Sequence, residues 1–143
     1  MNIHQISVFL ENRTGQLAEI TRLLADNGID LRAISIAETT DYGIVRLIVD
    51  DSAKASSILL QHGTILSMTP VWVVEVPDRP AGLAELLETL AAKHVDVEYM
   101  YSLFTHKDEF AYMVLRIPDD TMLEDALKDT GLKLVSHEEL GIQ

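Results

Sequence analysis

The chain repeats part of itself at an offset of 66 residues. In the 18-residue window that begins at Arg13, seven residues recur unchanged when the sequence is shifted by that distance. The identical pairs are Arg13/Arg79, Leu17/Leu83, Ala18/Ala84, Glu19/Glu85, Leu24/Leu90, Ala25/Ala91 and Asp30/Asp96. Repetition at such a distance indicates two copies of one structural unit. In a chain of 143 residues we therefore expect two small domains, residues 1–69 and residues 70–143.

Hydrophobic periodicity predicts the same order of elements in both copies. In the first copy, Leu17, Ile20 and Leu24 share one helical face, and Gly28 can end that helix in the left-handed conformation. The expected strands alternate or are rich in β-branched residues, over 6–10, 29–37, 44–49 and 65–68 in the first copy and 71–76, 97–104, 110–117 and 132–135 in the second. The order βαββαβ, twice over, predicts an α+β fold: two ferredoxin-like units whose antiparallel sheets carry helices on one face.

Three local signals refine these expectations. The cluster Asp50–Ser52 predicts an N-cap for the second helix. It pairs with the segment 119–121 at an offset of 69, so we expect a longer connection between the second and third strands of the second copy, and a fourth helix over 121–130. Pro80 suits the first turn of the third helix, where its missing N–H costs nothing. His94 stands where the first copy has Gly28, so we expect a positive φ there.

Composition excludes several classes of function. The chain has no cysteine, which removes disulfides, thiolate metal sites and cysteine nucleophiles. Its formal net charge of −12 argues against nucleic acid or anionic membrane partners. Neither a signal peptide nor a membrane-spanning apolar stretch is recognisable, so we expect a folded cytoplasmic protein. The five histidines have no metal-ligand spacing, and we expect neither a metal nor a cofactor.

The two strand-to-helix turns resemble those of the ACT-domain family. The resemblance rests on Asn12-Arg13-Thr14-Gly15-Gln16-Leu17 and on Asp78-Arg79-Pro80-Ala81-Gly82-Leu83, each followed by Ala-Glu and a leucine-rich helix. It covers nearly all of both copies and implies a stand-alone tandem ACT protein, a regulatory module that binds a small effector. The glycine is displaced by one residue between the copies, so the two loops differ in their fitness to bind.

The turns also have the chemistry that an amino acid requires. The N-terminus of a helix exposes unpaired N–H groups that suit a carboxylate, and glycine allows a ligand to approach the backbone closely. Asn12 or Asp78 can accept hydrogen bonds from an ammonium group, and Asp30 or Asp96 can add charge nearby. The resemblance implies that the effector lies between this loop and the second strand of a facing domain, in a homodimer. The candidate binding residues are Asn12, Arg13, Thr14, Gly15, Gln16, Leu17, Asp30, Ser35, Asp78, Arg79, Pro80, Ala81, Gly82, Leu83, Tyr99 and Tyr101.

Two other functions compete with this interpretation. Ferredoxin-like folds also include acylphosphatase-type hydrolases, and Arg13 or Arg79 could hold a phosphate. The glycine-rich loop and downstream asparagine of those enzymes are absent, as are a Ser/His/Asp set and a Walker loop. Alternatively, the repeats only join chains through their sheet edges and bind nothing small. We expect no catalysis, and the sequence names neither the effector nor a regulated enzyme.

Overall fold

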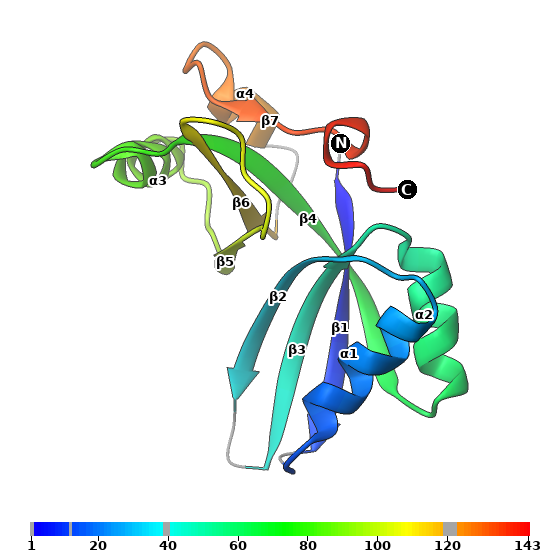
Figure 1. Cartoon of the computed structure of the whole chain (residues 1–143). Coiled ribbons are helices and arrows are strands. Elements are labelled where there is room, and N and C mark those ends of the chain that lie inside the picture. The colour runs from blue at the N-terminus through cyan, green and yellow to red at the C-terminus, as the bar shows by residue number, and fades with distance from the viewer. Residues whose placement is uncertain (1, 12, 39–40, 119–122) are drawn as a thin grey trace. The chain divides into compact units, whose positions relative to one another are not determined.

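The computed structural model describes residues 2–11, 13–38, 41–118 and 123–143 (Figure 1). The chain divides into two compact units between Thr69 and Pro70, and its two terminal segments belong to opposite units. The first-repeat unit is His4–Thr69 with Gly141–Gln143, and the second-repeat unit is Pro70–Leu140 with Met1–Ile3. Each unit therefore contains one copy of the repeat and closes with a short segment from the far end of the chain.

The first-repeat unit has a four-stranded antiparallel arrangement. Its elements are β1 (Ile3–Glu11), α1 (Gln16–Asp26), β2 (Leu31–Glu38), β3 (Tyr42–Val49), α2 (Ser52–Gln61) and the first part of β4 (Ile65–Pro77). The strands follow the order β2-β3-β1-β4 (Figure 1). Leu47 of β3 lies opposite Ile6 of β1 on one side and opposite Ile34 of β2 on the other. This is the strand order expected of a ferredoxin-like unit.

Alternate residues of these strands face the two helices and form the core with them. The buried cluster takes Ile6, Val8 and Leu10 from β1, Val45, Leu47 and Val49 from β3, Ile20 and Leu24 from α1, and Ala55 and Leu59 from α2. Because side chains of a strand alternate between its faces, this cluster places both helices on one face of the sheet. The core thus fixes the start of α1 against the end of β1.

The second-repeat unit repeats this architecture. It contains the rest of β4, α3 (Gly82–Ala92), β5 (Tyr99–Ser102), β6 (Phe110–Arg116), α4 (Leu123–Leu127), β7 (Lys133–Leu134) and α5 (His137–Leu140). Strand β4 pairs with β6 and β7, and β6 pairs with β5, all antiparallel. The order β5-β6-β4-β7 is therefore equivalent to that of the first unit. Its core joins Trp72, Val74 and Val76 of β4 to Leu86 and Leu90 of α3 and to Leu123 of α4.

The predicted fold class is confirmed, and several local predictions can now be judged. Asp51 is the N-cap of α2, and its side chain accepts a hydrogen bond from the amide of Lys54 at 3.1 Å. His94 has the expected positive φ, of 59°. Pro80 was wrongly placed in the first turn of a helix: α3 begins at Gly82 after Ala81 adopts a left-handed conformation, which leaves Pro80 outside. The segment 119–121, which pairs with Asp50–Ser52 in the sequence, lies outside the described residues.

A single strand crosses the boundary between the copies, where two separate strands were predicted. Residues 65–68 and 71–76 were predicted as separate strands, but both belong to the continuous 13-residue strand β4. Nothing in Thr69-Pro70 forces a turn, because proline has the φ of an extended chain and merely lacks a hydrogen-bond donor. The short helix α5 was not predicted, and α4 is shorter in the described residues than the expected 121–130.

Candidate functional site

The strand-to-helix corner has the same backbone in both copies. In the first corner the amide of Arg13 donates to the carbonyl of Glu11 at 2.9 Å, and in the second that of Arg79 donates to Pro77 at 3.0 Å. The N-cap residue of each helix is left-handed, with φ 87° and ψ −8° for Gly15 and φ 71° and ψ −8° for Ala81. The duplication recognised in the sequence is therefore a duplication of backbone geometry.

Among the described residues, no side-chain cap is found at the start of either helix. The N-cap residues Gly15 and Ala81 make no side-chain hydrogen bond to the first turns of α1 and α3. In the first corner, the amide of Gln16 reaches the carbonyl of Arg13 only at 3.4 Å, whereas in the second the amide of Gly82 reaches Arg79 at 3.0 Å. Unpaired amides at a helix N-terminus carry a partial positive charge and attract anionic groups.

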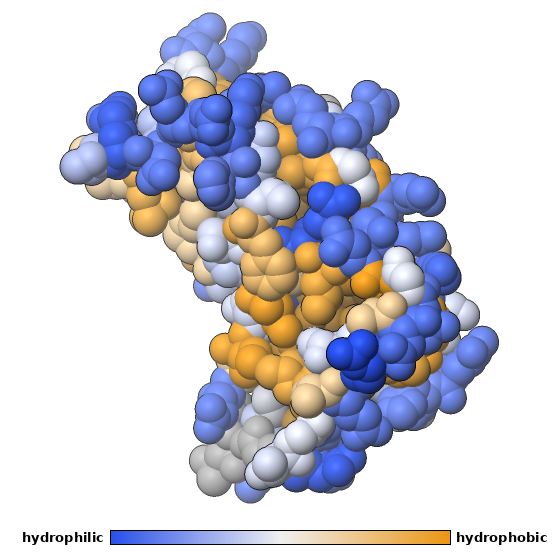
Figure 2. All heavy atoms as spheres, in the orientation of Figure 1, coloured by the Kyte–Doolittle hydropathy of each residue, from blue (hydrophilic) through white to orange (hydrophobic). Residues whose placement is uncertain are grey.

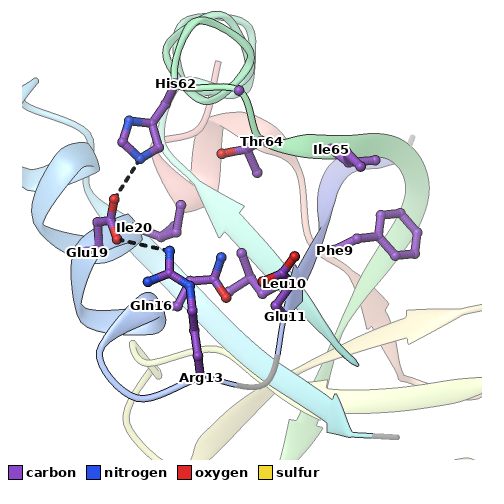
Figure 3. A pocket seen from close by; sticks show the side chains of 11 residues that line it. Phe9, Leu10, Glu11, Arg13, Gln16, Glu19, Ile20, His62, Thr64 and Ile65 are labelled. Atoms are coloured by element: carbon purple, nitrogen blue, oxygen red, sulfur yellow. Dashed lines mark hydrogen bonds and ion pairs between the residues drawn. The ribbon is translucent and has the colours of Figure 1, made fainter. Parts of the chain in front are cut away.

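A pocket of about 480 Å³ opens beside the first corner (Figure 3). Its walls come from the end of β1, the first turns of α1, and the turn from α2 into β4. The lining residues are Phe9, Leu10, Glu11, Arg13, Gln16, Glu19, Ile20, His62, Gly63, Thr64 and Ile65. In Figure 3, Arg13, Glu19 and His62 lie together on one side of the pocket, and Phe9 and Ile65 lie on the other. The pocket thus has a charged half and an apolar half.

Glu19 is the centre of the charged half. Its Oε1 lies 3.0 Å from Nε2 of His62, and its Oε2 lies 3.8 Å from Nη2 of Arg13 (Figure 3). Within the described residues the guanidinium of Arg13 makes only this long contact, so its hydrogen-bond donors point into solvent or into the pocket. The side-chain oxygen Oε1 of Gln16 is buried, and no described residue donates a hydrogen bond to it. Buried polar atoms are generally paired, so this oxygen is an acceptor that a ligand can satisfy.

The second corner has the same residues in a closed arrangement. Arg79 and Glu85 form two hydrogen bonds, Nη2 to Oε2 at 2.8 Å and Nη1 to Oε1 at 3.3 Å. Nη1 also donates to the carbonyl of Pro80 at 3.3 Å. The hydrogen bond and the charge of Glu85 hold the pKa of Arg79 above its ordinary value. A pocket of about 410 Å³ lies here too, lined by Pro77, Arg79, Glu85, Thr89, Thr130, Gly131 and Leu132.

The two glycines that the sequence placed in these corners have different surroundings. Gly15 has φ 87°, and a Cβ added to it would meet no atom within 4 Å. Gly82 is buried, and an added Cβ would stand 3.2 Å from the carbonyl carbon of Pro77 and closer still to its oxygen. Gly82 is therefore required by close packing of backbone on backbone, whereas Gly15 leaves the backbone open to a ligand.

Some predicted site residues lie near these corners and others lie at a distance. Thr14 is exposed beside Gly15, and Leu17 packs partly against the core of its unit. Asp78 is exposed, and its amide donates to the carbonyl of Glu109 at 2.8 Å. Leu83 is exposed on α3. Asn12 lies outside the described residues.

Asp30 and Asp96 stand at the opposite end of their units. Each follows the helix that the corner begins, and an eleven-residue helix is roughly 16 Å long. Asp30 pairs with Arg32 at 3.1 Å, and Asp96 lines a separate pocket with His94. Within their own units these carboxylates therefore cannot reach a ligand at the corner.

Ser35, Tyr99 and Tyr101 lie on the strands that end the strand order of each unit. Ser35 is on β2, opposite Arg46 of β3, and is half-buried. Tyr99 and Tyr101 are half-buried on β5, with their rings stacked at 6.4 Å between centroids. Their contact with an effector stays a prediction.

Sequence reasoning missed the part of the pocket that comes from other elements. Glu19 was recognised as a repeated residue, with Glu85, but was given no role, and its repetition was the available signal. His62 and Ile65 enter the pocket from the turn between α2 and β4. His62 is 43 residues from Glu19 in sequence, and no local pattern announces their contact.

Two further structural findings concern other kinds of site. No group of three or more His, Cys, Asp or Glu side chains among the described residues could hold a metal ion. None of the helices in the described ranges is long and apolar enough to cross a bilayer.

Comparison with known proteins decides the family. The family described as the ACT domain pair matches residues 1–141. This chain belongs to that family. Among solved structures, this chain is similar to protein BT0572 from Bacteroides thetaiotaomicron, with 36% sequence identity and a TM-score of 0.90. The match covers 99% of this chain and 96% of that one. No curated protein sequence matches this chain significantly.

More distant structures share the fold of the ACT domain pair. The regulatory subunit of aspartate kinase from Thermus thermophilus, in its ligand-free form, is 16% identical, with a TM-score of 0.67 and coverage of 87% of each chain. The corresponding subunit from Thermus flavus is 19% identical, with a TM-score of 0.65 and coverage of 90% of each chain. Membership of the ACT family supports a regulatory, ligand-binding role for this chain.

Proposed function

We propose that this ACT domain pair is a non-catalytic sensor that binds an amino acid at its strand-to-helix corner and passes the signal on through assembly. The observation that carries the proposal is the corner around Gly15. There a loosely held arginine and the first residue of α1, Gln16, line one pocket, and the open Gly15 directly precedes Gln16.

An amino acid fits the charges of this corner. Its carboxylate can accept hydrogen bonds from Arg13 and from the first amides of α1, a combination that is stronger than hydrogen bonds between neutral groups. Its ammonium can donate to Glu19 or Glu11 and to the buried oxygen of Gln16. A simple carboxylic acid would leave these acceptors unused.

A homodimer would connect binding to a response. Strand β2 ends the strand order of the first-repeat unit, and Ile36 on it is 53% exposed. Figure 2 shows apolar residues at the surface over β2 and β3 of that unit. Strands at sheet edges readily pair with another chain. We propose that a cytoplasmic dimer forms and that the effector shifts its assembly or its affinity for a regulated enzyme, as the regulatory subunits of similar fold suggest.

The proposal is tested by calorimetric titration of the protein with each of the twenty amino acids. We expect saturable binding of at least one, and we expect Gly15→Val to weaken it, because a branched side chain at φ 87° both strains the backbone and fills the ligand's approach. Gly28→Val is the matched control: Gly28 has a similar φ, 74°, at the other end of α1.

The two variants separate binding from stability. Both should lose stability, but only Gly15→Val should lose affinity while folded, as judged by circular dichroism. Unchanged affinity in Gly15→Val would remove the first corner from the site.

Hydrolysis is the competing function, and one observation weighs against it. Arg13 and Arg79 each face a carboxylate, Glu19 and Glu85, which would repel a phosphoryl dianion more strongly than the single carboxylate of an amino acid, whose ammonium group offsets that repulsion. Incubation with acetyl phosphate tests the point directly. Turnover that disappears on replacing Arg13 or Arg79 would establish an enzyme and overturn the sensor.

A further inference from the structure

We infer that the two corners are unequal: the first repeat holds the effector, an α-amino acid with an apolar side chain, and the second corner is kept shut by its own ion pair. The inference rests on the proposed function, because it assigns the site and the ligand class within it.

The two arginines are equivalent in the repeat but differ in their partners. Arg79 makes two hydrogen bonds to Glu85 and one to the carbonyl of Pro80. Arg13 lies 3.8 Å from Glu19, beyond hydrogen-bond length. Glu19 has a second partner, His62, at 3.0 Å. In the second repeat, Thr130 occupies the place of His62 in the corresponding turn. A ligand carboxylate can therefore bind the guanidinium of Arg13 without breaking a hydrogen bond. To bind Arg79, it must first break the two hydrogen bonds between Arg79 and Glu85.

The backbones that a ligand must approach also differ between the two corners. The residue before α1 is Gly15, beside which an added Cβ would meet nothing within 4 Å. The residue before α3 is Ala81, which adds a methyl group at the same place. The glycine of the second corner has moved to position 82, where it is buried against Pro77 and offers no surface to a ligand. Pocket size does not separate the copies, since the volumes are about 480 and 410 Å³.

The residues that line the first pocket favour a ligand with an apolar side chain. The first pocket contains Glu11 and Glu19 but only one permanent cation, Arg13. A ligand with a second carboxylate would face two like charges and only one counterion. The other half of the pocket is formed by apolar side chains, with Phe9 at 40% and Ile65 at 71% exposure (Figure 3). These exposed apolar groups gain most by contact with an apolar side chain. The class is thus the apolar amino acids rather than aspartate or glutamate.

Calorimetry with L-leucine and L-aspartate as probes tests the inference on the full chain. We expect leucine to occupy a single site per chain and aspartate to bind at least about tenfold more weakly. Arg13→Met should weaken leucine binding roughly ten- to a hundredfold, the value of a charged hydrogen bond. Arg79→Met should change it less than about twofold. Arg22→Met is the control for loss of an arginine on α1, because Asp26, on an exposed face, is the one ion-pair partner of Arg22 among the described residues.

The outcomes distinguish this inference from the proposed function. Two leucine sites per chain, or loss of affinity in Arg79→Met with Arg13→Met unaffected, would refute the inequality of the corners while leaving the sensor in place. Aspartate binding as tightly as leucine would refute the ligand class. If none of the twenty amino acids binds the folded protein, the proposed function fails and the inference fails with it.

Discussion

Replacing Gly82 by alanine should destabilise the second-repeat unit more than any ordinary surface change. Gly82 is the first residue of α3 and is buried under the carbonyl group of Pro77, with which an added Cβ would collide. The obstacle is backbone, so no rotation of a side chain relieves it. Overpacking costs about 1–3 kcal/mol, and a collision with backbone places the cost at the upper end, about 3 kcal/mol. Alanine's better helix propensity returns up to about 1 kcal/mol, so we expect a net loss of about 2 kcal/mol.

Gly15→Ala is the matched substitution in the other copy. At Gly15 an added Cβ has open space, and the only cost is the left-handed conformation, about 1 kcal/mol. Ala81 already adopts that conformation, with φ 71°, so the corner tolerates alanine there. The expected order of stability is therefore wild type, then Gly15→Ala, then Gly82→Ala.

Urea unfolding measures both variants. Trp72 is the sole tryptophan and is 5% exposed in the core of the second-repeat unit, so its fluorescence reports the unit that contains Gly82. Circular dichroism follows the helices of both units. The midpoint of the fluorescence transition should fall for Gly82→Ala with little change of slope. A loss below about 0.5 kcal/mol, within the usual range of a surface substitution, would refute the packing argument.

Two further predictions follow from packing and charge. Leu24→Ala removes a fully buried side chain from the first core and should cost about 2–5 kcal/mol, measured by urea unfolding followed by circular dichroism. The hydrogen bond from Lys133 lowers the pKa of Glu139, so its stabilisation is present above the ordinary carboxyl pKa of about 4.3 and is lost as the pH falls below it. The difference in thermal midpoint between wild type and Lys133→Ala should accordingly be small at neutral pH and should disappear in acid.

The repeated pattern of apolar residues was enough to predict the fold. Leu17, Ile20 and Leu24 fall on one helical face, and the structure buries that face against alternate residues of β1 and β3. Local patterns could not predict the contacts that the C-terminal residues make with the first-repeat unit. The amide of Gln143 donates to the carbonyl of Asp50 at 2.8 Å, and Nη2 of Arg32 donates to the carbonyl of Gly141 at 3.4 Å. The two contacts join residues 93 and 109 positions apart in the chain, a separation that periodicity cannot detect.

The sequence predicted only part of the candidate site. Arg13, Gly15 and Gln16 were found because the corner that contains them is duplicated, and duplication is visible in sequence. His62 and Ile65 were not found, because only the antiparallel topology returns the end of α2 to the start of α1. Asp30 was chosen for its repetition and its charge, but its partner within the unit is Arg32.

The comparison of the two corners separates what the fold requires from what a ligand requires. Both corners need a left-handed residue before the helix, and Ala81 meets that need without being glycine. Backbone conformation therefore favours glycine at position 15 by about 1 kcal/mol but does not require it. Close packing does not explain it either, since a Cβ there would touch nothing. A group that approaches this backbone from outside the chain would give glycine a reason at position 15 that is absent at position 81.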